Sequence, residues 1–118
     1  MAKPILIVED NPNMSSLLAD MLEVFDHSSV RASDGLRALD ELKKHDFSMI
    51  ITDMRMPNMS GLELLEKVKS EHPKLPVVLI SGYSMNEFKS DDASLRPDGF
   101  LAKPFMMSDI ERLLNSLL

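Results

Sequence analysis

Four groups of polar residues in this chain could do chemistry on a phosphoryl group. The acidic pair Glu9 and Asp10 follows one apolar run, and Asp53 follows another. Ser81 and Lys103 follow two later apolar runs in the same way. An acid with neighbouring acids, a hydroxyl and an ammonium group suits nucleophilic attack on phosphorus, because that reaction depends mainly on positioning and charge. Asp53 is therefore the candidate nucleophile.

The three acids require a counter-charge if they lie together. Two carboxylates about 5 Å apart repel each other by roughly 3 kcal/mol at an effective dielectric constant near 20. Lys103 supplies one positive charge. A hard divalent cation with oxygen ligands is the natural second, and Mg²⁺ is the ion that we expect in a cell.

The elements that must position these residues alternate between strands and helices. Apolar runs bounded by turn signals predict strands, and caps followed by helical stripes predict helices. The expected strands lie at 5–8, 27–32, within 47–53, at 77–80 and at 99–102. The expected helices begin after Asn11, at Asp34, at Ser60, near Met85 and at Ser108.

This alternation predicts a parallel sheet with helices on both faces. The second strand carries the polar residues Ser28, Ser29 and Arg31, which is typical of an edge strand. Together with right-handed crossovers, this favours the strand order 2-1-3-4-5. The predicted fold is thus an α/β, flavodoxin-like, doubly wound five-stranded sheet. Because the carboxyl ends of its strands share one edge, the polar groups should converge there.

Composition narrows the function classes. The 118 residues are 44% hydrophobic, which predicts a single domain over 1–118 with a full core. The chain has no cysteine, which excludes disulfides and sulfur-based metal sites and fits a cytoplasmic location. The net charge of −6 argues against direct nucleic-acid binding, and we expect no membrane-spanning segment.

Four motifs, in this order, resemble the receiver domain of bacterial two-component response regulators. They are ILIVEDN at 5–11, IITDMRMPNMSG at 50–61, LISGY at 79–83 and GFLAKPF at 99–105. The resemblance covers essentially the whole chain. It implies a phosphoacceptor signalling module that promotes its own phosphorylation and dephosphorylation and is not a turnover enzyme. Its partners would be a sensor histidine kinase or phosphotransfer protein and an unknown downstream effector or output domain, with a phosphorylation-dependent dimer as a further option.

The resemblance also implies a role for each matching residue. Asp53 would be the phosphoacceptor. Asp10 and Asp53 would bind Mg²⁺ together with the backbone carbonyl of Arg55, and Glu9 would act through water. Lys103 would contact the phosphoryl group.

A conformational switch is implied in the same way. Ser81 would move toward the phosphoryl group and Phe100 would turn inward, which changes the face formed by the fourth helix, the fifth strand and the last helix. The bond from Lys103 to Pro104 would be a cis peptide, which aims the lysine.

Other functions remain to be weighed against this one. The main alternative is a Mg²⁺-dependent phosphohydrolase with an aspartyl nucleophile. Such enzymes typically place a second acid two residues after the nucleophile, where this chain has Arg55. A flavin-binding module would need a Ser/Thr/Gly run after the first strand, which is missing. A degenerate receiver is disfavoured because the full set of residues is present.

Overall fold

The structure is a computed structural model that describes residues 3–81 and 97–118. Its elements are β1 (Ile5–Val8), α1 (Pro12–Val24), β2 (Ser29–Ala32), α2 (Gly35–Lys44), β3 (Met49–Asp53), α3 (Gly61–Glu71), β4 (Val77–Ser81), β5 (Gly99–Ala102) and α4 (Met107–Leu117). The helix predicted near 85–95 lies outside the described residues, so the predicted last helix is the one labelled α4.

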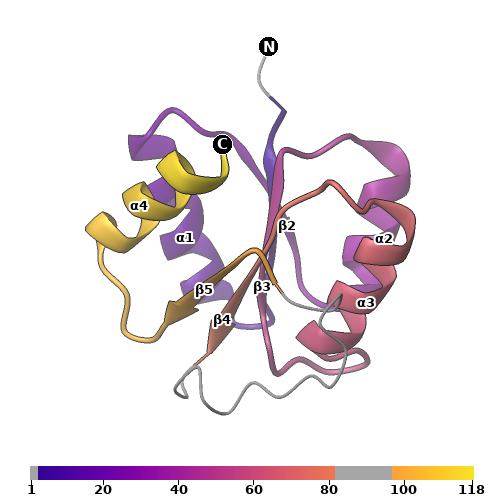
Figure 1. The fold of residues 1–118 in the computed structure, drawn as a ribbon. Coiled ribbons are helices and arrows are strands. Elements are labelled where there is room, and N and C mark those ends of the chain that lie inside the picture. Colours follow the sequence, from indigo (N-terminus) through magenta and orange to yellow (C-terminus); the bar gives the residue numbers. More distant parts are fainter. Residues whose placement is uncertain (1–2, 82–96) are drawn as a thin grey trace.

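The strands form one parallel sheet in the order β2-β1-β3-β4-β5. This confirms the predicted topology, with the polar second strand at the edge. Figure 1 shows the sheet running through the middle of the molecule, and β3 is its central strand. Strands β1, β3 and β4 are apolar because helices cover both of their faces.

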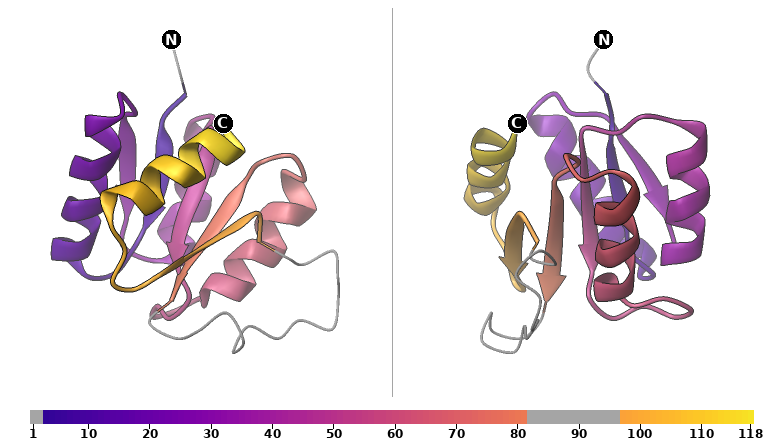
Figure 2. Two further views of the ribbon diagram at one scale, coloured as in Figure 1. Left: turned by 60° about the vertical axis from the view of Figure 1, so that its left-hand side comes forward. Right: turned by 45° about the vertical axis from the view of Figure 1, so that its right-hand side comes forward.

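Helices α1 and α4 cover one face of the sheet, and α2 and α3 cover the other (Figure 1). The views in Figure 2 show the same two layers. Because successive side chains of a strand point to opposite faces, β1 contributes to two cores. Ile5 and Ile7 pack under α1 and α4, whereas Leu6 and Val8 pack under α2 and α3. All four side chains are fully buried.

The predicted caps fix the starts of three helices. Asn11 caps α1, and Pro12 is the first residue of that helix. Asp34 and Ser60 cap α2 and α3, each accepting a hydrogen bond from the amide three residues later, at 2.8 and 3.1 Å. Each cap satisfies an amide that the helix itself cannot. The three helices therefore begin directly after the loops at one edge of the sheet.

The predicted start of the second strand is wrong. Strand β2 begins at Ser29 and not at residue 27. His27 N donates a hydrogen bond of 2.9 Å to Leu22 O, so His27 still belongs to the turn that closes α1.

The predicted start of the last helix is also wrong. Helix α4 has Met106 as its N-cap residue, and Ser108 lies inside the helix. Asp109 Oδ2 accepts a hydrogen bond of 2.7 Å from Met106 N. The acidic side chain of the first turn therefore satisfies this helix end without a serine cap.

Asp98 fastens β5 to β4 at the end of the sheet away from the predicted site. Its Oδ2 accepts hydrogen bonds from Val77 N at 2.8 Å and from Lys69 Nζ at 2.7 Å. The amide of Asp98 donates in turn to Val77 O at 2.8 Å. The pairing of β4 and β5 is thus fixed at its first residues.

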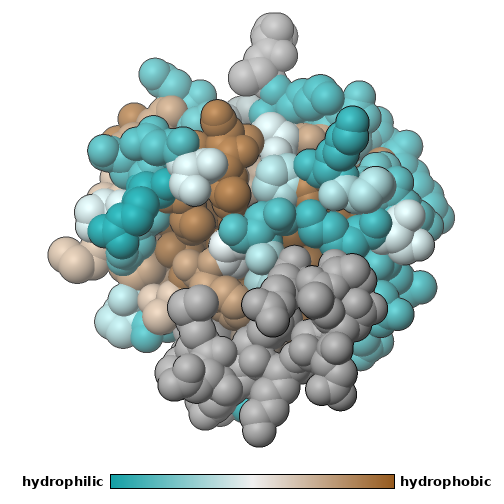
Figure 3. Space-filling view, viewed as in Figure 1, coloured by the Kyte–Doolittle hydropathy of each residue, from teal (hydrophilic) through white to brown (hydrophobic). Residues whose placement is uncertain are grey.

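The hydropathy of the surface differs between the two helical layers. Figure 3 shows a band of hydrophobic residues between α4 and the sheet, whereas the surface over α2 and α3 is mainly hydrophilic. The apolar residues that recur at helical spacing along α1 are not all buried: Leu17 is 45% exposed, whereas Leu18 and Leu22 lie in the core. None of the helices in the described part of the chain is long and apolar enough to cross a membrane.

Candidate functional site

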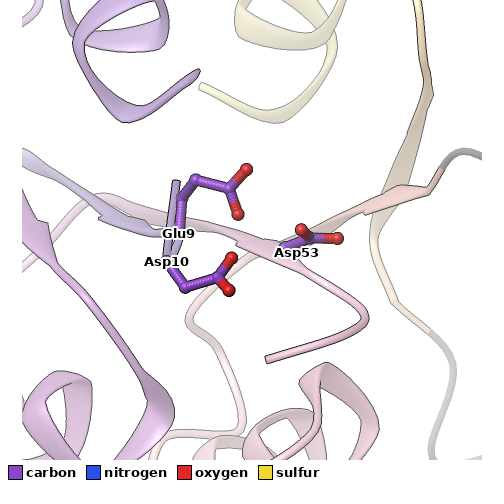
Figure 4. Close-up of side chains that lie close together, drawn as sticks. All are labelled: Glu9, Asp10 and Asp53. Carbon is purple, nitrogen blue, oxygen red and sulfur yellow. The ribbon is translucent and has the colours of Figure 1, made fainter. Parts of the chain in front are cut away.

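Three acids converge at the carboxyl edge of the sheet, as the topology predicts. Glu9 and Asp10 directly follow β1, and Asp53 is the last residue of β3, the neighbouring strand. Each offers a carboxylate oxygen, and these oxygens lie within 4.8 Å of one another. Figure 4 shows the three side chains directed toward a common space. Residues more than forty positions apart in the sequence thus form one acidic cluster.

Lys103 brings a positive charge to the cluster from the end of β5, the strand at one edge of the sheet. It follows β5, and its Nζ donates a hydrogen bond of 3.4 Å to Asp53 Oδ2. The same nitrogen lies 3.7 Å from Glu9 Oε1. The Lys103–Pro104 peptide bond is cis, as predicted. One ammonium group therefore offsets part of the charge of two carboxylates.

Glu9 is the most deeply buried of the three acids. It is 3% exposed, and its Oε2 has no hydrogen-bond partner within the described residues. The pKa of its carboxyl group is raised from 4.5 to about 7, and burial is the largest cause. A hydrogen bond with Asp53 and the charges of Asp53 and Asp10 raise this pKa as well, whereas Lys103 lowers it. The cluster therefore holds more negative charge than Lys103 alone can offset.

A divalent cation fits this donor set. All three groups are carboxylates, which are the ligands that Mg²⁺ and Ca²⁺ prefer. A buried carboxylate oxygen that lacks a partner is also unusual in a folded protein, since such groups are nearly always satisfied. The observed cluster, with its orphan oxygen, is consistent with a metal centre bounded by Glu9, Asp10 and Asp53.

The two predicted switch residues lie on adjacent strands. Ser81 is the last residue of β4, in register with Ala102 of β5. Its backbone therefore lies one strand from Asp53 and directly beside the residue that precedes Lys103. Phe100 is partly buried and packs against the core under α2 and α3. Ser81 thus lies on the strand next to Asp53, and Phe100 lies on β5, the edge strand that leads to Lys103.

Arg55 lies beside Asp53 in the loop that leaves β3. Its amide donates a hydrogen bond of 3.5 Å to Asp53 Oδ1. Sequence analysis did not predict the contacts that shape this loop. Asn58 adopts a left-handed backbone conformation with φ of 69°, and its side chain donates to Asp34 Oδ2 at 3.1 Å. An asparagine in a turn was the available signal, because asparagine tolerates positive φ better than most residues.

Gly61 is a second residue whose role at the site was missed. An added Cβ there would lie 2.4 Å from Asp53 O and 2.9 Å from Met54 Cα. Both are backbone atoms, so no side chain could move aside. Glycine at this position lets the start of α3 lie directly against the residue at the centre of the acidic cluster.

Comparison with known proteins agrees with this geometry. The sequence matches the family model of the response regulator receiver domain over residues 5–115. Chemotaxis protein CheY-3 of Vibrio cholerae is 32% identical over 116 residues, which cover 96% of this chain and 89% of that protein.

Two solved structures have the same fold over nearly the whole chain. CheY4 of Vibrio cholerae superposes with a TM-score of 0.90 at 26% identity, covering 100% of both chains. The response regulator TrrA of Thermotoga maritima, solved in complex with Mg²⁺ and BeF, has a TM-score of 0.87 at 28% identity and covers 98% of this chain and 99% of that one. The chain therefore belongs to the response regulator receiver domains, which are the phosphoacceptor signalling modules of two-component systems.

Proposed function

We propose that Asp53 is the phosphoacceptor of this domain and takes its phosphoryl group from a phosphohistidine of a sensor histidine kinase or phosphotransfer protein. The observation that carries this proposal is the position of Asp53 within the acidic cluster, with its Oδ2 3.4 Å from Lys103 Nζ. A carboxylate oxygen of Asp53 attacks phosphorus, and the bond from phosphorus to the histidine nitrogen breaks. The product is an aspartyl phosphate on this chain and a free imidazole on the donor.

Mg²⁺ is the cofactor that we propose for this reaction. Asp10, Asp53 and the backbone carbonyl of Arg55 would bind it, and Glu9 would act through water. When bound, the ion neutralises charge on the phosphoryl oxygens as they approach Asp53. The acidic cluster and the orphan oxygen of Glu9 support this choice. TrrA, which is similar to this chain, was solved with Mg²⁺ and BeF.

Lys103 and Ser81 complete the reaction centre in this proposal. The ammonium group of Lys103, already within hydrogen-bonding distance of Asp53, stabilises the oxygens of the transferred group. Ser81 and Phe100 then transmit the phosphorylated state to β5, to α4 and to the helix that the sequence predicts near residues 85–95, outside the described residues. Support for this step comes from the place of Ser81 at the end of β4 and of Phe100 on the adjacent strand β5.

The biological setting belongs to the same proposal. Residues 1–118 act as one receiver domain that is not a turnover enzyme, although its own residues promote gain and loss of the phosphoryl group. It works in the bacterial cytoplasm, and it signals to a downstream effector or output domain or through a phosphorylation-dependent dimer. Neither nucleic acid nor a membrane is a direct partner.

Phosphorylation from a small-molecule donor tests the role of Asp53. The protein is incubated with acetyl phosphate and Mg²⁺, and its intact mass is measured. We expect the addition of one phosphoryl group that Asp53→Asn abolishes and that Asp46→Asn, which removes an exposed acid at the opposite end of the sheet, leaves unchanged.

Two outcomes would contradict the proposal. Equal labelling of Asp53→Asn and wild type would show that another residue is the acceptor. Phosphate release over many turnovers, without a stable phosphoprotein, would show a phosphohydrolase instead.

A further inference from the structure

The loop between β3 and α3 contacts the start of α2, which lies outside the acidic cluster. Asn58 Nδ2 donates a hydrogen bond of 3.1 Å to Asp34 Oδ2. The two residues are 24 positions apart and belong to different crossovers of the sheet. This contact joins the segment that leaves the phosphoacceptor strand to a helix that carries none of the acids.

Asp34 is held in place to accept this bond. Its other oxygen, Oδ1, accepts from Arg37 N at 2.8 Å as the cap of α2, and the residue is only 9% exposed. The hydrogen bonds from Arg37 N and Asn58 lower the pKa of the Asp34 carboxyl group, so both oxygens serve as acceptors at neutral pH. A carboxylate fixed by a helix cap is a rigid anchor for the loop.

Packing supplies a second tie between the same two segments. Met59, next to Asn58, is buried, and its side chain lies against Gly35 at the start of α2. A Cβ at Gly35 would come within 2.9 Å of Met59 Cβ and Sδ. The hydrogen bond of Asn58 and the packing of Met59 therefore both hold the middle of the loop against the start of α2.

Both ends of the loop touch the phosphoacceptor. At its start, Arg55 N donates to Asp53 Oδ1 at 3.5 Å. At its end, Gly61 N donates to Met54 O at 2.9 Å, and Gly61 lies directly against Asp53 O. The loop thus closes on the residue next to Asp53, so a shift of its middle changes the path of the backbone at Arg55.

We infer that Asp34 and Asn58 are a positioning pair that holds the β3–α3 loop so that the backbone of Arg55 stays against Asp53. This inference rests on the proposed function, in which that backbone helps to bind Mg²⁺ beside the phosphoacceptor. Neither residue touches the reacting atoms. Their contribution is to fix a neighbouring group, as residues around metal ligands commonly do.

Two single substitutions separate the contact from the backbone conformation. Asn58→Gly removes the side chain and with it the hydrogen bond to Asp34. Glycine adopts a φ of 69° without strain, so the backbone conformation of the loop is retained. Asn58→Asp places a second carboxylate against Asp34 and turns the attraction into repulsion. Ser48→Ala is the matched control, since it removes hydrogen bonds to Lys3 O and Pro4 O at the opposite end of the sheet.

A double substitution restores the contact with its polarity reversed. In Asp34→Asn with Asn58→Asp, the new amide at position 34 can donate to the new carboxylate at position 58 while its oxygen still caps α2. The net charge of the pair is unchanged. If the hydrogen bond between the two positions is what matters, this exchange should restore function. If the original side chains act in some other way, it should not.

The measurements are the Mg²⁺ dissociation constant, by calorimetry, and the saturating rate of phosphorylation by phosphoramidate. Asn58→Gly should weaken Mg²⁺ binding about tenfold, the lower end of the range typical for groups that orient a metal ligand. Asn58→Asp should weaken it further, and the double variant should recover most of the loss. The phosphorylation rate should follow the same order, and Ser48→Ala should match wild type in both measurements.

The outcomes distinguish this inference from the proposed function. Suppose that wild type is phosphorylated on Asp53, but Asn58→Gly and Asn58→Asp bind Mg²⁺ as tightly as wild type. This result would overturn the positioning role and leave the proposed function intact. Failure of wild type to accept a phosphoryl group would refute the proposed function, while the Mg²⁺ constants still decide whether the pair positions the loop. A double variant as defective as Asn58→Asp would also overturn the inference.

Discussion

Replacing Glu9 with Gln should stabilise the metal-free protein, and the gain should grow as the pH rises. Glu9 is 3% exposed and lies among the carboxylates of Asp10 and Asp53. Folding raises its pKa from 4.5 to about 7, so the native protein favours the protonated carboxyl group. The stabilisation from this group is complete below the unfolded pKa and is lost as the pH rises through the folded pKa. Glutamine imitates the protonated group at every pH.

The size of the effect follows from the shift in pKa. Raising the pKa from 4.5 to about 7 corresponds to roughly 3 kcal/mol at about 1.4 kcal/mol per unit. The variant should therefore exceed wild type by about 1 kcal/mol at pH 5 and by about 3 kcal/mol at pH 8. The stability difference between the variant and wild type therefore grows by about 2 kcal/mol from pH 5 to pH 8. For a domain of this size, that growth corresponds to a change of roughly 8 °C in the difference between their Tm values.

Urea denaturation followed by circular dichroism, with a chelator present, measures this difference between pH 5 and pH 8. Glu66→Gln, at an exposed position on α3, is the matched control and should show no such growth. Saturating Mg²⁺ should restore the stability of wild type more than that of Glu9→Gln, because a cation favours the ionised carboxylate. A stability difference that stays constant or shrinks toward pH 8 would refute the reasoning.

Three further substitutions test other contacts. Gly61→Ala should lower the free energy of unfolding by about 1–3 kcal/mol, since its Cβ would lie 2.4 Å from Asp53 O; an unchanged urea midpoint would contradict this. Lys103→Ala should slow phosphorylation by phosphoramidate about 100-fold. Its Mg²⁺ affinity by calorimetry should not fall, because a competing positive charge is removed, and a fall would count against the assigned role. Asp34→Ala should be less stable than wild type at pH 6. The difference should shrink as the pH falls below 3.8, because the carboxylate of Asp34, whose pKa is lowered from 3.8 by hydrogen bonds from Arg37 N and Asn58, loses its contribution as it is protonated; equal urea midpoints at pH 6 would contradict this.

The buried strands are the part of the fold that the sequence predicts best. Residues 5–8 and 77–80 are continuous apolar runs bounded by turn signals, and such runs are typical of strands covered on both faces. The structure places β1 at Ile5–Val8 and extends β4 by one residue to Ser81. The start of β2 is less predictable, since its polar residues carry no such pattern and a backbone hydrogen bond from His27 extends the preceding turn.

The convergence of the acids was also predictable, because it follows from topology alone. Once the strand order is known, Glu9, Asp10 and Asp53 must share one edge. The environment of each acid was not predictable, since it depends on packing. The raised pKa of Glu9 comes from its burial, and the contact between Asp34 and Asn58 comes from the path of a loop. Neither leaves a periodic signal in the sequence.

The spread of the site over β1, β3 and β5 makes competence for signalling a property of the completely folded chain. No local segment contains both the acids and Lys103, which is 50 positions from Asp53. If these residues bind the cation and accept the phosphoryl group as proposed, a nascent or partly unfolded chain would have no complete site and would not be phosphorylated. Phosphorylation would thus select for folded molecules, because only chains that have completed long-range strand pairing could accept the phosphoryl group and signal.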